Sequence, residues 1–524
     1  MKISVIIPCY KASGTIAKCL GSIFDQDYKN FEVICVLDGP DDITERLIKA
    51  FDVKYDVIEH GGACKARNHG FGMSEGDVII FSDADCYWQP GIFRTYIETL
   101  TETGKDFVYG GFRYPDGQSH NPHEFDEYLL TTANYIDTGN PVSRKWVEEA
   151  GGFDESLKRF QDWDFWLRVV KAGAVGVKIK DLTRETEHAD KESISGQDNY
   201  EETFKIVREK HVKEERPICV ASPAAFGHGL RVGKMCGWDF WHDPRMLPID
   251  YKAIYLLGCF PEGIQGNVQM FMDGRTRDRR DCKYLIHWIG TDVLHMRAML
   301  PFIQAKNIRL MFDKYNVKHF CQSEQNAEEM RELGFDVEVL PLPVENNYKL
   351  SPMPDKFTVA CYDHGGVDQK WHKWLVMELA KAMPDVDFKF FGNRNAVGKD
   401  KNTEWLGHVP MQEVIDKSSC LVRFTIHDGY PVAPVEFMFS GKKVITNVPD
   451  MPFTNYVDLG VVNDDRVPEI KQMVLREIRK VQDDPIWTSA VHSDVVKHYE
   501  TLLSKEKFKK RIEEVVNDPV QAQN

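Results

Sequence analysis

The stretch "DVIIFSDADCYW" at residues 77–88 decides the prediction of the fold. Its apolar part predicts a short buried strand over 77–82. Asp83 and Asp85 therefore follow directly where a strand ends, which is the edge at which an open parallel sheet binds ligands. Two carboxylates this close repel each other unless a cation lies between them, and hard oxygen ligands suit Mg²⁺ or Mn²⁺. A solvated acidic turn is the alternative interpretation of this short motif.

Short apolar runs alternate with helical patterns on both sides of this stretch. The pattern predicts strands over 3–7, 31–37 and 77–82, and helices over 13–24, 41–50 and 62–73. Such an alternation is typical of an α/β domain with a mainly parallel sheet.

Two polar stretches divide the rest of the chain. The first, at 207–217, precedes a new predicted strand over 218–222, and the second, the Pro-containing 345–356, is typical of a linker. We therefore predict domains over 1–213, 217–345 and 355–500, followed by a charged carboxy-terminal helix or tail over 501–524. The two successive α/β segments after the first domain predict a two-lobed unit with a cleft between its lobes.

The charge of the chain argues against a nucleic-acid partner. The formal net charge is −15, and residues 1–210 carry −12 of it. An acidic surface repels a phosphate backbone. Basic clusters at 274–283 and 504–511 are typical of solvated helix faces, and weak contact with an anionic acceptor or membrane surface is the alternative.

Cysteine usage and hydropathy favour the cytoplasm. The 12 cysteines include no CxxC pair, and many lie inside apolar runs, as free thiols in a reducing compartment do. No apolar run approaches the length of a membrane span, and the apolar start before Pro8 is too short for a signal peptide. We expect a cytoplasmic protein, with peripheral membrane association as the alternative.

Further motifs share the order and the strand-end positions of the acidic pair. They are "VIIPCY" after the first strand, "LDGPDD" after the second, "ARNHG" in the third helix, "FQDWDFW" at a helix start and "ETEH" at 185–188. Together they resemble the large inverting glycosyltransferase family with the GT-A fold, often called family 2, over roughly residues 1–210. The resemblance implies that Pro8, Tyr10 and Asp38 surround the nucleotide base, and that Arg67 belongs to the family's "ARN-x-G" element.

The same resemblance implies a metal site and a catalytic base. Asp83 and Asp85 match the Asp-x-Asp motif that holds a divalent metal, Mn²⁺ or Mg²⁺, on the donor diphosphate, and His188 matches a position that completes the metal shell. Asp162 matches the base. A cation stabilises the leaving nucleoside diphosphate, and a carboxylate can take the proton of an acceptor hydroxyl. One carboxylate suffices for a single displacement, which inverts the anomeric centre.

The chain departs from the family pattern at two places, and simpler roles remain open. Gln161 stands where the family usually has Glu, and "LDGPDD" lacks the usual Asp-Asp-Gly-Ser. The alternative interpretation of Asp38 is a turn former or helix cap, that of Asp162 is a cap, and that of His188 is an exposed histidine. Asp164 is better explained as a cap or as an ion-pair partner of Arg168 than as the base.

A second constellation lies in "FTIHDGYPVAPVEFMFSGKKVITN", residues 424–447. It resembles the retaining GT-B glycosyltransferases often called family 4, with Asp428 in place of the first Glu of their signature and Glu436 matching the second. The resemblance covers roughly 217–500. It implies that Glu436 holds the donor ribose and Asp428 the donor sugar, while Gly429 allows close backbone approach.

The diphosphate-binding residues of this second unit are less well matched. Lys370 and Lys373 are the candidates, although their spacing departs from the family's basic pair. Asp428 is also explained as a turn residue, and Glu436 as a helix-start charge favoured by the helix dipole.

The sequence therefore predicts an α/β glycosyltransferase in which a GT-A domain precedes a GT-B unit of two Rossmann-like lobes. We expect transfer of sugars from nucleotide-sugar donors, with UDP-sugars favoured, to a glycan or lipid-linked glycan. The favoured version is bifunctional. The alternatives are a single active GT-A transferase with a non-catalytic acceptor-binding or scaffolding unit, and a sugar nucleotidyltransferase, which the first turn "PCYKASGTI" disfavours because it lacks a Gly-rich, Lys-bearing signature.

Overall fold

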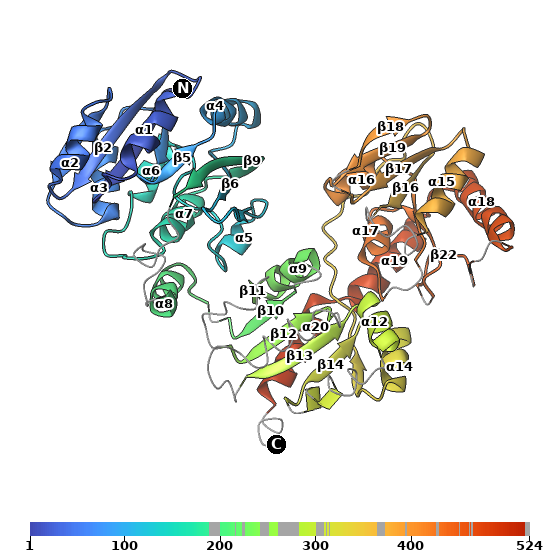
Figure 1. Cartoon of the computed structure of the whole chain (residues 1–524). Coiled ribbons are helices and arrows are strands. Elements are labelled where there is room, and N and C mark those ends of the chain that lie inside the picture. Colours follow the sequence, from blue (N-terminus) through green and yellow to red (C-terminus); the bar gives the residue numbers. More distant parts are fainter. Residues whose placement is uncertain are drawn as a thin grey trace. The chain divides into compact units, whose positions relative to one another are not determined.

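The computed structural model of the chain divides into two compact units, with the boundary near residue 215 (Figure 1). Each unit is described by itself. The structure describes residues 1–187, 200–214, 216–222, 226–241, 251–259, 282–299, 309–310, 312–313, 315–363, 372–393, 396–425, 429–449, 451–460, 462 and 465–518.

The first unit is built on a mixed sheet with the strand order β3-β2-β1-β4-β8-β6-β9-β5, and β7 pairs with β6. Strands β1 to β4 are parallel to one another, whereas β8 runs antiparallel to β4. The strands are β1 Ile3–Cys9, β2 Phe31–Asp38, β3 Lys54–Ile58, β4 Val78–Phe81, β5 Cys86–Trp88, β6 Phe107–Arg113, β7 Ser119–His120, β8 Val142–Ser143 and β9 Gly176–Thr186.

Helices cover both faces of this sheet. The helices are α1 Ile16–Phe24, α2 Asp42–Ile48, α3 Ala63–Met73, α4 Ile92–Thr103, α5 Glu127–Leu130, α6 Arg144–Ala150, α7 Gln161–Lys171 and α8 Tyr200–His211. Alternate residues of β1 point toward α1 and α4, whose apolar side chains recur at helical spacing and form one core with them. On the other face α3 approaches β1 so closely that a Cβ at Gly70 would lie 2.5 Å from Ile6.

The predicted strands and helices of this unit are confirmed to within a few residues. Strand β3, Lys54–Ile58, is an addition that the apolar pattern did not reveal. It lies at the edge of the sheet, and its side chains are exposed or half-buried, so it carries no continuous apolar run.

The second unit contains two further sheets. The first has the strand order β11-β10-β12-β13-β14-β15, and all its paired strands are parallel. Its elements are β10 Ile218–Ala221, α9 Phe226–Cys236, β11 Asp239–Trp241, β12 Ala253–Leu257, β13 Lys283–Trp288, α12 Thr291–Met299, β14 Lys318–Cys321, α14 Glu324–Glu332 and β15 Val337–Val339.

The second sheet of this unit has the order β18-β19-β17-β16-β20-β21-β22, with β18 antiparallel to β19 at one edge. Its strands are β16 Thr358–Tyr362, β17 Asp387–Phe391, β18 Val397–Asp400, β19 Thr403–Gly407, β20 Cys420–Arg423, β21 Lys443–Thr446 and β22 Asn455–Tyr456. Its helices are α15 Lys373–Ala382, α16 Met411–Asp416, α17 Val432–Phe439, α18 Val467–Asp483 and α19 Ser489–Leu502.

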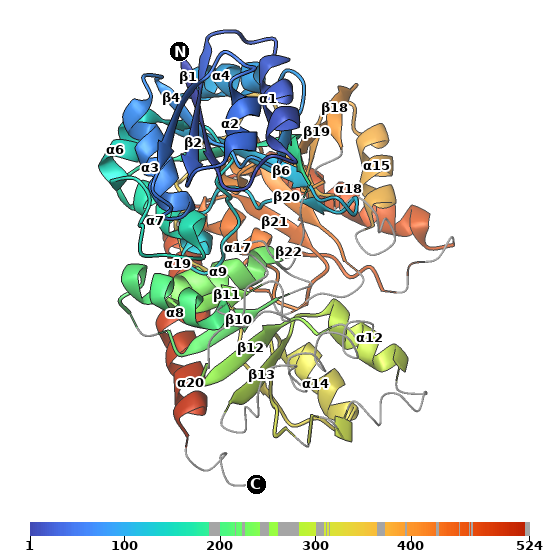
Figure 2. The ribbon, with the colours of Figure 1, turned by 60° about the vertical axis from the view of Figure 1, so that its left-hand side comes forward.

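Helix α20, Lys505–Asn517, returns from the second of these sheets to the first (Figure 2). Its Phe508 is buried against Trp238 and Tyr255, and Arg511 forms a bidentate ion pair with Glu338 at 2.6 and 2.9 Å. The segment that its sequence characterises as charged is therefore an amphipathic helix whose apolar face joins the core of the second unit.

Among the described residues, no helix is both long enough and apolar enough to cross a membrane.

Candidate active site

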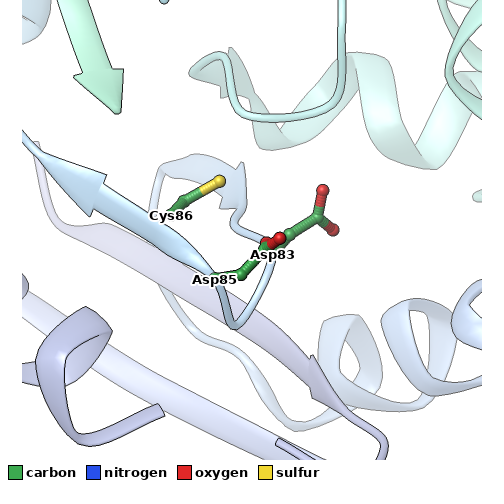
Figure 3. A group of neighbouring side chains, drawn as sticks. All are labelled: Asp83, Asp85 and Cys86. Atoms are coloured by element: carbon green, nitrogen blue, oxygen red, sulfur yellow. The ribbon is translucent and has the colours of Figure 1, made fainter. Parts of the chain in front are cut away.

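The acidic pair lies on the short segment between β4 and β5, at the carboxyl end of β4 (Figure 3). Possible ligand atoms of Asp83, Asp85 and Cys86 lie within 4.8 Å of one another. Burial raises the pKa of the Cys86 thiol to about 12, so this sulfur stays protonated at neutral pH. The donor set that remains consists of two carboxylates, which suits a hard divalent cation that takes its other ligands from water and phosphate.

Arg67 links the acidic pair to the start of α7. Its guanidinium is buried, donates through Nη2 to Asp83 Oδ1 at 2.7 Å and through Nη1 to Gln161 Oε1 at 3.0 Å. Gln161 thus accepts a hydrogen bond from Arg67 where a Glu would have formed a second ion pair with it. Because the guanidinium already has one carboxylate partner, a neutral amide completes its hydrogen bonding without adding negative charge beside the acidic pair.

Arg67 is itself held in place by its neighbour Asn68. The Asn68 side chain both accepts from the backbone N–H of Phe153 at 2.7 Å and donates to its carbonyl at 2.9 Å. The "ARN" sequence therefore anchors α3 to the "GGF" turn before α7, which explains why an Arg–Asn pair occurs there.

Asp162 lies in the first turn of α7. Its Oδ1 accepts from the Trp163 backbone N–H at 2.8 Å, and its Oδ2 accepts from Asn134 Nδ2 at 3.0 Å. Burial raises the pKa of the Asp162 carboxyl above its ordinary value, although both hydrogen bonds oppose the shift. A carboxyl with a raised pKa is a stronger proton acceptor than an exposed aspartate.

Arg67, Asp83 and Asp162 line one cavity of about 200 Å³. The other lining residues are Asn134, Thr138, Arg159, Phe160 and Gln161. Phe160 precedes α7 with a positive φ of 55°, a conformation that a bulky residue adopts only at a cost of about 1–3 kcal/mol. Backbone strain of this kind is typical of functional sites, and here it sets the direction in which α7 begins, directly before Gln161 and Asp162.

The residues predicted to surround a nucleotide base form a separate group at the ends of β1 and β2. Tyr10 is about half exposed and stacks on His60 with ring centroids 4.5 Å apart, while the His60 ring lies 2.9 Å from Asp38. Asp38 also accepts from the backbone N–H groups of Gly61 and Gly62 at 2.7 and 2.9 Å, and so shapes the turn into α3. Pro8 lies in β1 and is half-buried.

Asp164 has a structural environment that Asp162 lacks. It is fully buried and accepts from Arg168 Nη2 at 2.7 Å and from His211 Nε2 at 2.8 Å, and Lys210 Nζ lies 2.7 Å from it. Burial alone would raise its pKa, but these cationic partners outweigh burial and hold the pKa well below its ordinary value. The predicted pairing of Asp164 with Arg168 is confirmed, and Asp164 joins α7 to α8.

Three predicted residues lie outside the described residues: His188, Lys370 and Asp428. The structure therefore leaves their predicted contacts with a metal or a donor as predictions.

The remaining predicted residues of the second unit contact other parts of that unit. Gly429 lies so close to the start of α14 that a Cβ would meet Gln322 Oε1 at 2.8 Å, which accounts for a glycine there. Lys373 forms an ion pair with the buried Asp363 at 2.9 Å. Glu436 is buried at the first turns of α17 and accepts from the Tyr348 hydroxyl at 2.6 Å.

Several lining residues of the first unit were missed by the sequence analysis. Asn134, Thr138 and Arg159 belong to loops and match no motif, so no signal in a single sequence distinguishes them from ordinary loop residues. Gln161 did carry a signal, because it stands at a position where the family pattern has an acidic residue.

Comparisons with known proteins agree on the amino-terminal region. Residues 4–160 match the sequence model of the family described as "Glycosyl transferase family 2". This region therefore contains a glycosyltransferase family 2 domain, and the match covers the Asp-x-Asp pair but ends just before Asp162.

Curated relatives match about a third of the chain. The chain is 30% identical over 189 residues to "Glycosyltransferase AglE" of Haloferax volcanii. This alignment covers 33% of this chain and 62% of that protein. The chain is 32% identical over 176 residues to "Glycosyltransferase GlyA" of Streptococcus pneumoniae, which covers 33% of this chain and 24% of that protein. The chain thus spans less than two thirds of either relative.

A search of solved structures finds S. aureus TarS 1-349 in complex with UDP-GlcNAc. This structure is 16% identical, covers 59% of this chain and 84% of that chain, and has a TM-score of 0.37.

Proposed function

We propose that the first unit is an inverting glycosyltransferase that uses a nucleotide-sugar donor, with a UDP-sugar favoured, and that Asp162 is its base. The single observation that carries this proposal is that Asp162 lines one cavity together with Asp83, which lies in the region that matches the family 2 model. A metal-binding carboxylate and a proton acceptor with a raised pKa in one cavity are the two groups that a single displacement at an anomeric carbon needs.

Each residue then has a definite task. Asp162 accepts the proton of the acceptor hydroxyl as that oxygen attacks the anomeric carbon, and the bond from this carbon to the diphosphate breaks. Arg67 holds Asp83 in place through the 2.7 Å ion pair, and Gln161 fixes the guanidinium from the other side. We assign the donor base to the group formed by Pro8, Tyr10 and Asp38, where an exposed aromatic ring offers a stacking surface.

A divalent cation, Mn²⁺ or Mg²⁺, fits the acidic pair. Asp83 and Asp85 provide oxygen ligands close together at a strand end, and a thiol with a raised pKa beside them does not compete as a thiolate. We propose that these two residues bind the cation, with His188 as a further ligand. When bound, the cation would neutralise charge on the leaving diphosphate.

Replacing Asp85 with Ala tests the metal and the donor together. Mn²⁺-promoted binding of UDP-sugars should be lost, and donor hydrolysis should fall by at least about 10²-fold, because metal stabilisation of the leaving group contributes several kcal/mol. Isothermal titration with a panel of nucleotide sugars, with and without Mn²⁺, measures the effect. Asp52→Ala, which removes an exposed carboxylate of the same unit, is the matched control. Full activity in excess chelator would contradict metal dependence.

Asn134 is expected to position Asp162 and to lower its pKa. Only the amide nitrogen of Asn134 can face the carboxylate, because two oxygens would repel each other, and this hydrogen bond favours the charged form. Asn134→Ala should shift the acid limb of the kcat/KM profile to higher pH and reduce kcat by about 10-fold, which corresponds to one hydrogen bond to a charged group. Asn134→Asp should shift the limb further, since a second carboxylate disfavours ionisation of the first. An unchanged acid limb in both variants would exclude this role.

A second candidate function concerns the second unit. We propose that its two parallel sheets form a GT-B arrangement that acts as a second transferase, over residues 217–345 and 355–500, with 501–524 as a terminal helix and tail. The observation that favours it is the burial of Glu436 at a cavity lining position. In this proposal Glu436 contacts the donor ribose, Asp428 and Gly429 approach the donor sugar, and Lys370 and Lys373 the diphosphate. A non-catalytic unit that binds the acceptor is the alternative.

The acceptor and the cellular location of the enzyme are part of the proposal. We propose a glycan or lipid-linked glycan acceptor and a cytoplasmic enzyme, with peripheral membrane contact through basic clusters such as 504–511 as the alternative. The location is supported by the 12 cysteines, all of which are free thiols and most of which are buried.

A further inference from the structure

The second unit contains a cavity of about 350 Å³, which lies outside residues 4–160, the part of the chain that the family model matches. Residues from α9, the segment after β15, α17 and α20 surround it. The lining residues are Arg231, Lys234, Met235, Val344, Glu345, Asn347, Tyr348, Glu436 and Lys505.

The guanidinium of Arg231 makes no hydrogen bond to any residue that the structure describes. Its Nε and Nη2 atoms are inaccessible to solvent and have no partner. The nearest carboxylate oxygen, Glu436 Oε1, lies 3.8 Å from Nη1, which is beyond hydrogen-bond distance, and this oxygen already accepts from Tyr348 at 2.6 Å. Nε and Nη2 carry three of the five N–H donors of the guanidinium, and leaving these three unmatched while they are removed from water is costly.

The other charges around the cavity do not supply the missing partner. Lys505 lies 3.3 Å from Glu345, so that this carboxylate is already shared with a cation. The lining residues comprise three cations and two carboxylates, and they leave a net positive charge in a partly desolvated space. An anion with several acceptor oxygens would match both the charge and the fixed, planar donors of Arg231.

We propose that this cavity binds a phosphate-bearing ligand, such as a sugar phosphate or a nucleoside diphosphate, and that Arg231 is its principal contact. Buried polar atoms normally have a hydrogen-bond partner, so the unmatched Nε and Nη2 atoms of Arg231 favour an anionic ligand in this cavity. This inference goes beyond the transfer reaction of the first unit, and it holds whether the second unit transfers a sugar or only binds an acceptor.

The test uses the full-length protein in excess chelator, which removes the metal-dependent binding expected of the first unit. Inorganic pyrophosphate, UDP and glucose 1-phosphate are titrated separately by calorimetry, and hydrogen exchange locates the protected segments. Protection of 226–236, 344–348 and 432–439 by at least one of them is expected. A preference for UDP indicates a nucleotide site, whereas a preference for glucose 1-phosphate indicates a phosphorylated glycan. No protection of these segments by any of the three would overturn the proposal.

Arg231→Met retains the length of the side chain and removes its donors. We expect phosphate-ligand binding at these segments to weaken by about 10- to 100-fold, the effect of one or more hydrogen bonds to a charged group. Because Arg231 makes no hydrogen bond among the described residues and its ion pair with Glu436 is long, at 3.8 Å, the melting temperature of the variant should change little. Arg297→Met, which removes an exposed arginine paired with Glu329 in the same unit, is the matched control. A large drop in melting temperature with unchanged ligand binding would show that Arg231 is structural and contradict the proposal.

Discussion

Asp162→Asn is expected to reduce glycosyl transfer by at least about 10²–10⁴-fold, the contribution of general-base catalysis, while donor binding survives. An amide has nearly the shape of the carboxylate and can still accept from the Trp163 N–H, so the start of α7 should be preserved. It cannot, however, take the proton of an acceptor hydroxyl. Single-turnover transfer and donor titration, measured on the same preparation, separate the loss of chemistry from a loss of binding.

Two outcomes bear on the assignment of the base and on the role of the second unit. If Asp164→Asn abolished transfer in a still folded protein while Asp162→Asn did not, the assignment of the base would be wrong. If Asp162→Asn still added a different sugar to a pre-extended acceptor, detected by mass spectrometry, the second unit would be a transferase of its own. The role of Asp162 as base also predicts a pH dependence for the wild-type enzyme. Transfer should fall as the pH drops through the raised pKa of Asp162, because the protonated carboxyl accepts no proton.

The sequence was sufficient for those parts of the site that chain continuity fixes. An apolar strand followed at once by Asp83 and Asp85 places both residues at the carboxyl end of that strand, because the chain leaves the strand there. The same reasoning places Asp162 in the first turn of a helix. Local periodicity therefore predicted the elements of residues 1–82 apart from β3, and the ends at which Asp83, Asp85 and Asp162 lie.

Contacts between distant segments were not predictable in the same way. The ion pair from Arg67 to Asp83 and the hydrogen bond from Asn134 to Asp162 depend on how loops return across the sheet, and loop conformation has no periodic signal. The mixed order of the sheet beyond β4, with β8 and β9 inserted from later in the chain, is likewise set by tertiary packing. These long-range contacts determine whether a carboxylate is a base or a structural anchor.

In the second unit, too, sequence motifs did not predict the contacts that individual residues make. Gly429 matched a motif that implies approach to a ligand, yet the atoms that approach it are those of Gln322 and Asn326 from another lobe of the same unit. Arg231 is the one cation of its cavity whose lack of hydrogen-bond partners is established among the described residues, and the sequence did not single it out as a site residue. A missing partner is a property of three-dimensional surroundings and leaves no trace in residue type.

Asp164→Asn is expected to destabilise the first unit by about 3 kcal/mol, although the residue lies only two positions from the proposed base. The substitution removes the negative charge that Arg168, Lys210 and His211 share, and the two cations Arg168 and Lys210 then repel each other around a buried amide. Arg168 and Lys210 are partly exposed and can gain water, so the effect should lie at the lower end of the about 3–5 kcal/mol observed when buried ion pairs are broken.

The dependence of this effect on pH provides its control. The folded-state pKa of Asp164 lies below the ordinary value of 3.8, so its contribution to stability is fully present above that value and is lost as pH falls through the folded-state pKa. The difference in unfolding free energy between wild type and Asp164→Asn, measured by urea denaturation, should therefore be constant at neutral pH and shrink below about pH 4. A difference that persisted undiminished in acid would mean that shape and hydrogen bonding, and not charge, hold α7 to α8. Asp162→Asn, by contrast, should leave the stability near that of wild type, because a buried carboxyl with a raised pKa gains little from being charged in the folded state.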